Sequence, residues 1–297
     1  MSGPITRFAP APTGYLHLGH VANAIFVWGL AGADGGQVIL RIEDHDRGRC
    51  RPAYEAALLD DLDRLGFLPD RPSTDAFRAG RSPFRQSDSD DAYLEALGRL
   101  RSAGLVYACE CSRATFAAWE AGTGRPWSGP GCPGDCRERA LPMVAAANLR
   151  VALGDGVEPF VDRILGARSG EPSARGDLLV RGPDGWTYAF AVVVDDLRHG
   201  VELVVRGEDL LDETPRQIRL GRLLSRTEPP AFAHHPLVRR PDGRKLSKAD
   251  GDTSVRELLA AGSSAETLIG RAAAEVGLDP SGRPRSTAEI AGLFTPA

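Results

Sequence analysis

An alternation of extended and helical segments at the start of the chain most constrains how this protein can fold. An apolar extended run at residues 5–9 is broken by prolines and a glycine, and a helical apolar stretch then begins at Val21. Residues 38–42 are almost continuously apolar, as in a parallel strand that is buried on both faces. A second helix begins at Pro52 and ends at Gly66. This order predicts a doubly wound α/β fold.

The pattern changes after the helix expected at 89–103. Residues 107–139 hold four of the five cysteines, with a Gly/Pro-rich middle and little periodicity. Three apolar segments at 178–180, 188–194 and 202–205, a helix at 213–224 and two tail helices at 254–261 and 265–276 are expected to follow. A loop-rich insertion therefore separates two halves of the α/β unit.

Cations in this chain are almost all arginines. Lys and Arg together number 36, of which only Lys245 and Lys248 are lysines. A lysine ammonium is a compact charge on a flexible stem that can follow a moving phosphate, whereas arginine presents a planar fork. The net charge of −4 gives no general basic excess, so an RNA partner would need a local basic surface.

No segment is long enough for a membrane span. The longest apolar stretch, residues 21–33, includes Asn23 and is well short of the about 20 residues that a spanning helix needs. The stretch could mimic the apolar part of a signal peptide, but a patterned loop with one arginine and two histidines precedes it. We therefore expect a cytoplasmic protein without a membrane partner.

The first candidate site is the loop and helix start that follow the first strand. The chain reads Arg7-Phe8-Ala9-Pro10-Ala11-Pro12-Thr13-Gly14 and then His17-Leu18-Gly19-His20. A helix N-terminus after such a loop offers backbone N–H groups and a positive dipole end to an anion. The two imidazoles can donate to phosphate oxygens, and Gly19 lets a nucleotide approach the backbone closely. The combination predicts a nucleotide site.

The two lysines form the second candidate site, in the run Lys245-Leu246-Ser247-Lys248. Taken alone, this run would be an ordinary charged loop. Together with the first site it predicts a phosphate clamp, because charge that develops on the α- and β-phosphates during displacement is best met by cations and N–H donors already in place.

These two runs resemble the "HIGH" and "KMSKS" signatures of class I aminoacyl-tRNA synthetases. The runs Arg7-Phe8-Ala9-Pro10 and Arg41-Ile42-Glu43-Asp44-His45-Asp46 are similar to those of the glutamyl branch in particular. The resemblance implies a Rossmann-like catalytic domain in which ATP contacts His17, Gly19, His20 and Lys248. It assigns catalysis to His17, His20, Lys245 and Lys248, with Mg²⁺ expected on the phosphates.

The resemblance also implies a glutamate site, made of Arg7, Phe8, Ala9, Pro10, Ala11, Glu43, Tyr188 and Arg206. Glutamate carries two carboxylates and an ammonium, which suit two guanidinium forks and one acid. Glutamine would leave a buried cation unpaired, at a cost of about 3–5 kcal/mol. Ala11 stands where the family usually has Ser, so one hydroxyl contact is missing. Two alternatives remain open: Glu43 pairs only with Arg41, and Tyr188 belongs to the core.

Four cysteines form a separate cluster, Cys109-Glu110-Cys111 and Cys132-Pro133-Gly134-Asp135-Cys136. Two close pairs of thiolates suit one tetrahedral structural zinc ion. In the resembling family the third ligand is commonly Tyr, and Cys132 stands at that spacing from Cys136. Two disulfides or free thiols are the alternatives, and a cytoplasmic chain argues against the disulfides. Cys50 stands apart and is expected to be a small packed residue.

The resemblance implies a ligase that joins L-glutamate to AMP with release of pyrophosphate and then passes the glutamyl group to a tRNA hydroxyl. The chain ends 49 residues after Lys248, where glutamyl-tRNA synthetases continue into anticodon-binding domains. Short length and the cysteine cluster resemble the glutamyl-Q tRNA(Asp) synthetases, which modify the queuosine of tRNA(Asp). We expect this acceptor and a monomer.

Three alternatives compete with this interpretation. A truncated glutamyl-tRNA synthetase would charge the tRNA 3′ end with the same activation chemistry. A zinc-stabilised RNA-binding module without catalysis would not need His17, His20, Lys245 and Lys248. A nucleotidyl transferase of the pantothenate-ligase type would lack the set of Arg7, Glu43 and Arg206.

We expect four parts along the chain. They are a first half of the catalytic domain at 1–105, a zinc-binding insertion at 106–180, the second half of the catalytic domain at 181–228, and the lysine loop with a helical tail at 229–297.

Overall fold

A six-stranded sheet forms the centre of the molecule. The computed structural model describes residues 3–123, 132, 135–144, 148–239 and 253–295. In spatial order the sheet contains β2 (Gln37–Leu40), β1 (Ile5–Phe8), β9 (Leu203–Gly207), β10 (Ala231–His235), β5 (Glu158–Asp162) and β6 (Gly166–Gly170). All neighbouring strands are parallel except β5 and β6, which are antiparallel. This arrangement confirms the predicted α/β fold.

Local sequence explains where the first helices begin and end. Helix α1 (Leu18–Asp34) starts after the Gly/Pro loop, and Gly35 ends it in the left-handed conformation, with φ of 64°. Helix α2 (Pro52–Leu65) has proline at its first position, where no N–H is needed, and Gly66 ends it with φ of 78°. Both ends lie where glycine carries no steric cost at positive φ.

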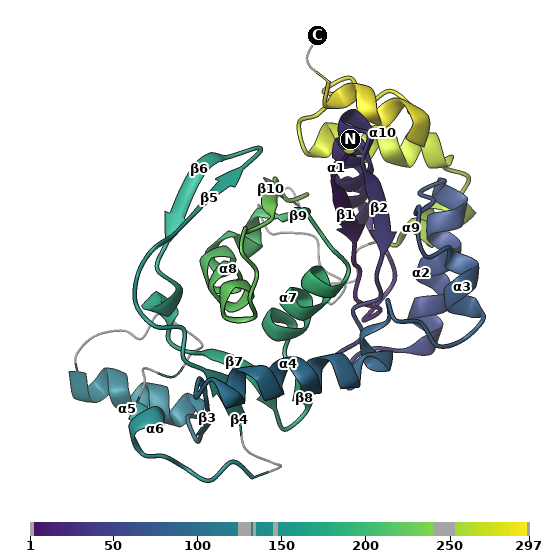
Figure 1. Cartoon of the computed structure of the whole chain (residues 1–297). Coiled ribbons are helices and arrows are strands. Elements are labelled where there is room, and N and C mark those ends of the chain that lie inside the picture. Colours follow the sequence, from purple (N-terminus) through teal and green to yellow (C-terminus); the bar gives the residue numbers. More distant parts are fainter. Residues whose placement is uncertain (1–2, 124–131, 133–134, 145–147, 240–252, 296–297) are drawn as a thin grey trace.

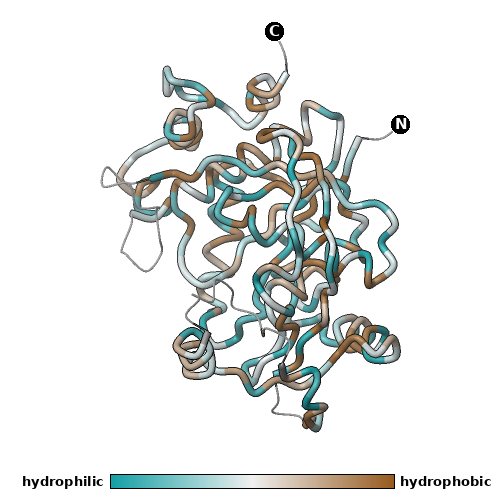
Figure 2. The backbone as a smooth tube through the Cα atoms, turned by 90° about the vertical axis from the view of Figure 1, so that its left-hand side faces the viewer, coloured by the Kyte–Doolittle hydropathy of each residue, from teal (hydrophilic) through white to brown (hydrophobic). Residues whose placement is uncertain are grey.

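The main hydrophobic core lies around α1. Side chains of β1, β2, α1, α2 and β9 meet those of α9 (Val255–Ala260) and α10 (Ala265–Glu275), which lie at the same end of the molecule (Figure 1). Brown, apolar segments run through the middle of the chain trace in Figure 2, and teal is more frequent in the outer loops. None of the helices in the described part of the chain combines the length and the apolar character of a membrane span.

A second, four-stranded antiparallel sheet carries the cysteine-rich insertion. Its order is β3 (Val106–Cys109), β4 (Asn148–Val151), β7 (Leu178–Gly182) and β8 (Gly185–Trp186). One face packs against α4 (Asp90–Ser102) and α7 (Tyr188–Arg198) in a separate core. The apolar segment 188–194 is thus the first part of a helix, buried against this sheet and α8 (Thr214–Leu223).

The predicted insertion at 106–180 does not stay within the second sheet. Strand β5 pairs with β10 through Asp162 and Phe232, so β5 and β6 extend the central sheet. Alternating burial along β5 is the pattern of a strand with one covered face. The other elements among the described residues are α3 (Thr74–Arg78), α5 (Arg113–Thr123), α6 (Asp135–Glu138) and 3-10 helices at Gln86–Asp88, Pro172–Arg175, Glu208–Glu213 and Thr287–Leu293.

Candidate active site

A cavity of about 630 Å³ opens at the carboxyl ends of β1, β9 and β10 and at the N-terminus of α1. The chain adds β2 to one side of β1 and β9 to the other side, so the sheet extends in opposite directions from β1. Ligands of doubly wound sheets bind at this position. The predicted residues that line the cavity are Arg7, Phe8, Ala9, Pro10, Ala11, His17, Gly19, His20, Glu43, Tyr188 and Arg206.

Two histidines cap the helix at the floor of this cavity. Nδ1 of His17 accepts from the Gly19 N–H at 3.1 Å, and Nδ1 of His20 accepts from the His17 N–H at 3.1 Å. Because each Nδ1 is an acceptor, the proton of each neutral ring lies on Nε2, the nitrogen that can donate to a phosphate oxygen. A Cβ on Gly19 would lie 2.9 Å from Cε1 of His17. The absence of a side chain at Gly19 therefore leaves space for the imidazole ring of His17.

A buried network of charges holds Glu43 and Arg7. Arg41 donates to Asp196 at 2.6 Å and to Glu43 at 2.9 Å, and Arg7 donates to the same Asp196 oxygen at 3.1 Å. Burial lowers the pKa of Arg41, but Asp196, Glu43 and Asp195 outweigh it and raise that pKa. Burial likewise raises the pKa of Asp196, and the two arginines more than reverse this. Glu43 therefore pairs with Arg41 and lines the cavity as well.

Arg206 has a different environment, because its hydrogen-bond partners are neutral side chains. It donates to His234, Gln217 and Thr214 at 3.0, 2.6 and 2.6 Å. No ion pair of Arg206 with a carboxylate occurs among the described residues, and burial lowers its pKa. A buried guanidinium without an acid partner favours an anionic ligand. Burial also raises the pKa of Tyr188, which adds a neutral donor to this side of the cavity.

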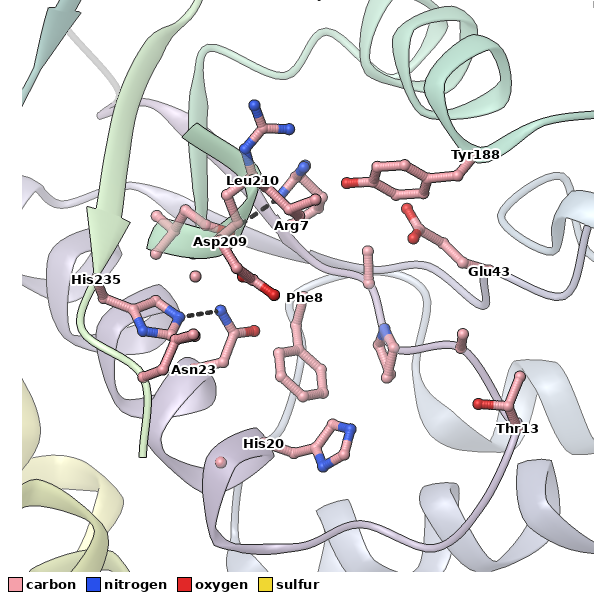
Figure 3. Close-up of a pocket in the computed structure, with 18 of the residues that line it drawn as sticks. Arg7, Phe8, Thr13, His20, Asn23, Glu43, Tyr188, Asp209, Leu210 and His235 are labelled. Atoms are coloured by element: carbon pink, nitrogen blue, oxygen red, sulfur yellow. Dashed lines mark hydrogen bonds between the residues drawn. The ribbon is translucent and has the colours of Figure 1, made fainter. Parts of the chain in front are cut away.

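The cavity also contains residues that the sequence did not single out. In Figure 3, Asn23 and His235 lie at the wall opposite Glu43 and Tyr188, and 2.8 Å separates Nδ2 of Asn23 from Nε2 of His235. His235 also bonds the Pro236 carbonyl through Nδ1, and burial lowers its pKa. Asn23 follows His20 by one helical turn, a periodicity that could have indicated it. Nothing in the local sequence marks His235.

The lysine loop lies outside the described residues, and with it Lys245 and Lys248. Leu237 and Val238, which precede it in the chain, line the cavity.

The four cysteines lie together beside β3. Their four sulfur atoms all lie within 4.8 Å of one another. Cys111 Sγ is 3.6 Å from Cys132 Sγ and 3.5 Å from Cys136 Sγ. Sulfurs at the usual 2.3 Å from one tetrahedral zinc ion would be about 3.8 Å apart. All four cysteines are free of disulfides. Arg150 donates to Cys109 Sγ at 3.1 Å, a cation that suits thiolates. These donors fit zinc.

Comparisons with known proteins agree with this geometry. Residues 5–121 and 146–282 match the family described as tRNA synthetases class I (E and Q), catalytic domain. A glutamyl-Q tRNA(Asp) synthetase of Symbiobacterium thermophilum is 42% identical over 97% of the chain and 91% of its own length. A glutamate–tRNA ligase of Alkalilimnicola ehrlichii is 38% identical over 84% of the chain, which spans about half of that protein (52%).

A solved structure also resembles the molecule as a whole. The crystal structure of glutamate-tRNA synthetase from Elizabethkingia anophelis has a TM-score of 0.78 and 25% identity, covering 98% of this chain and 65% of its own.

Proposed function

The chain belongs to the class I tRNA synthetases of the E and Q family, and on that premise we propose that it activates L-glutamate with ATP and transfers it to the queuosine of tRNA(Asp). One observation carries the proposal. The acid Glu43, the buried cation of Arg206 and the imidazoles of His17 and His20 line a single cavity. The 42% identical relative supports the choice of acceptor.

Glutamate would lie between β1, β9 and α7. Arg206, which lacks an acid partner among the described residues, would take one carboxylate of the substrate. Glu43 would take the ammonium, since Arg41 occupies only one of its oxygens. Arg7, Tyr188 and residues 8–11 would close the wall around the substrate. Glutamine would lose the pairing with Arg206, at a cost of about 3–5 kcal/mol.

Adenylation would follow by attack of the glutamate α-carboxylate on the α-phosphorus, with pyrophosphate leaving. Nε2–H of His17 and of His20 would donate to phosphate oxygens at the positive end of α1. Gly19 would lie under the nucleotide, and Lys245 and Lys248 would add ammonium charge to the leaving phosphates. Mg²⁺ would accompany ATP and neutralise part of its charge.

Zinc would be held by Cys109, Cys111, Cys132 and Cys136, with no open position and no part in the chemistry. Its contribution would be folding free energy for the insertion. We propose that the protein acts as a monomer in the cytoplasm.

Pyrophosphate exchange tests the activation step. Exchange of labelled pyrophosphate into ATP is expected to depend on L-glutamate and to need no tRNA. Exchange supported by glutamine instead, or no exchange at all, would contradict the proposal. Label from glutamate should then reach tRNA(Asp) that carries queuosine and not the same tRNA without it; transfer to the 3′ end would favour the glutamate–tRNA ligase activity.

A further inference from the structure

His45 lines the same cavity, and the activation step proposed above does not use it. It follows Glu43 by two residues, in the loop beyond β2, and its ring centroid lies 6.2 Å from that of Tyr188. Nδ1 of His45 is 2.7 Å from Oε1 of Gln86, a buried side chain at the start of the 3-10 helix Gln86–Asp88. The histidine therefore connects the cavity with the interior of the protein.

The protonation of His45 follows from the residue behind Gln86. Nε2 of Gln86 donates at 2.8 Å to Asp195, a fully buried carboxylate. Asp195 also accepts from the Tyr93 hydroxyl at 3.0 Å and from Arg198 Nε at 2.8 Å. Asp195 accepts in each of these bonds, so the NH₂ group of Gln86 faces the carboxylate.

With the amide of Gln86 in this orientation, only one tautomer of His45 fits the hydrogen bond. The amide oxygen faces the ring and only accepts, so Nδ1 of His45 carries the proton. The lone pair of the neutral imidazole is then on Nε2. Among the described residues, none makes a hydrogen bond to this nitrogen.

We propose that His45 is the general base of the transfer step, and that Gln86 and Asp195 position it. This inference rests on the proposed function. Nε2 would accept the proton of the acceptor hydroxyl of the tRNA as its oxygen attacks the glutamyl carbonyl carbon. The new ester C–O bond forms, the bond from that carbon to the phosphate oxygen breaks, and AMP leaves with the electron pair. The proton then passes to AMP or to water.

Other charged groups near His45 define its electrostatic surroundings. Glu43, Asp46 and Arg49 belong to the same segment after β2, and Tyr188 faces His45 from α7. A general base acts only while it is unprotonated, so transfer should slow toward acid pH.

The test compares the two half-reactions in His45→Asn and His45→Gln. The asparagine amide can replace Nδ1 as the donor to Gln86, and the glutamine amide can occupy the region of Nε2, but neither is a base. Pyrophosphate exchange is measured beside single-turnover transfer of labelled glutamate from preformed adenylate to queuosine-bearing tRNA(Asp). We expect transfer to fall about 10²-fold in both variants, since general bases contribute about 10²–10⁴. Exchange should fall less than about fivefold.

The pH profile separates a base from a structural residue. The slowing of transfer toward acid pH that a general base produces in the unmodified protein should disappear in both variants. Transfer at the unmodified rate would overturn the inference, and so would an equal loss of exchange, which would assign His45 to glutamate or ATP binding. If the unmodified protein exchanges but transfers glutamate to no tRNA, the proposed acceptor function fails, and the role of His45 fails with it.

Discussion

The catalytic cavity and the cysteine cluster are built by opposite means. The cavity lies on a parallel sheet whose core joins β1, β2, α1, α2 and β9. Buried ion pairs hold its side chains Arg7 and Glu43. The insertion sheet is covered by α4 and α7 on one face only. Val106 and Val151 point into that core, whereas Tyr107 and Cys109 face the small cluster around the cysteines.

The difference shows what each region needs in order to be ordered. Around the cavity, burial of apolar surface supplies the free energy, and the charges are fixed by one another. Beside β3, the cluster formed by the described residues consists of four cysteines, Tyr107, Leu141 and Ala152, which is a small apolar core. A metal ion is the usual means of stabilising so small a core.

Metal removal should affect the two regions most unequally. Chelation, or Cys136→Ser, is expected to raise amide hydrogen exchange in β3 and β4 by at least about 10²-fold, because four sulfurs lose their common partner. The amides of β1 and β9 should keep their protection. Mass spectrometry of the native protein should find one zinc per chain, retained in the control Cys50→Ser. Equal exchange in both regions would contradict the comparison.

A substitution in the cavity should leave the insertion intact and impair glutamate use. Arg206→Lys keeps the charge but loses the fork that bonds His234, Gln217 and Thr214. We expect kcat/KM for glutamate in pyrophosphate exchange to fall about 10²–10³-fold, equivalent to about 3–4 kcal/mol. Arg181, whose guanidinium stacks on Trp186 in the second sheet, provides the control Arg181→Lys. A loss of zinc in Arg206→Lys would contradict the independence of the two regions.

The smallest effect is expected at Asp61, a buried carboxylate on α2 without a hydrogen-bond partner among the described residues. Burial raises its pKa to about 6, against the opposing charges of Arg256 and Arg64. As pH rises, the unfolded chain loses this proton near pH 4 and the folded protein only near 6, so stability falls across that interval. Above it, the ionised group costs free energy.

Asp61→Asn should therefore stabilise the protein by about 1–2 kcal/mol at pH 7, after allowance for screening of the charge, and by little at pH 3.5. Denaturant unfolding at the two pH values measures the difference. The exposed carboxylate of Glu95 on α4 provides the control Glu95→Gln, with no expected change. Equal stabilisation at both pH values would exclude ionisation as its cause.

Much of the fold could be predicted from short-range patterns. The strand at residues 5–9, the helix start at Pro52 and the helix ends at glycines can be predicted from neighbouring residues alone. The segment 188–194 was harder, because a helix buried between a sheet and α8 is apolar nearly all round and shows little periodicity. Strands β5 and β6 join the central sheet because β5 pairs with β10, and the local sequence does not predict this pairing.

The site shows the same division. The two histidines were indicated by their loop, but the close approach of the His17 ring to Gly19 emerges only from the side-chain conformation. Gln86 contacts His45 across 41 positions of the chain and His235 contacts Asn23 across 212, so these contacts depend on the tertiary structure.

The sequence by itself determined the helix entrance with its two histidines, the paired cysteines and the concentration of lysine at two positions, because these depend on neighbours in the chain. Only the tertiary structure decided which polar side chains meet: Arg41 bonds Asp196 across 155 positions of the chain, and Gln86 bonds Asp195 across 109. Strand order in the sheet sets these pairings, and it follows from burial of apolar surface by the whole chain, which no single segment encodes.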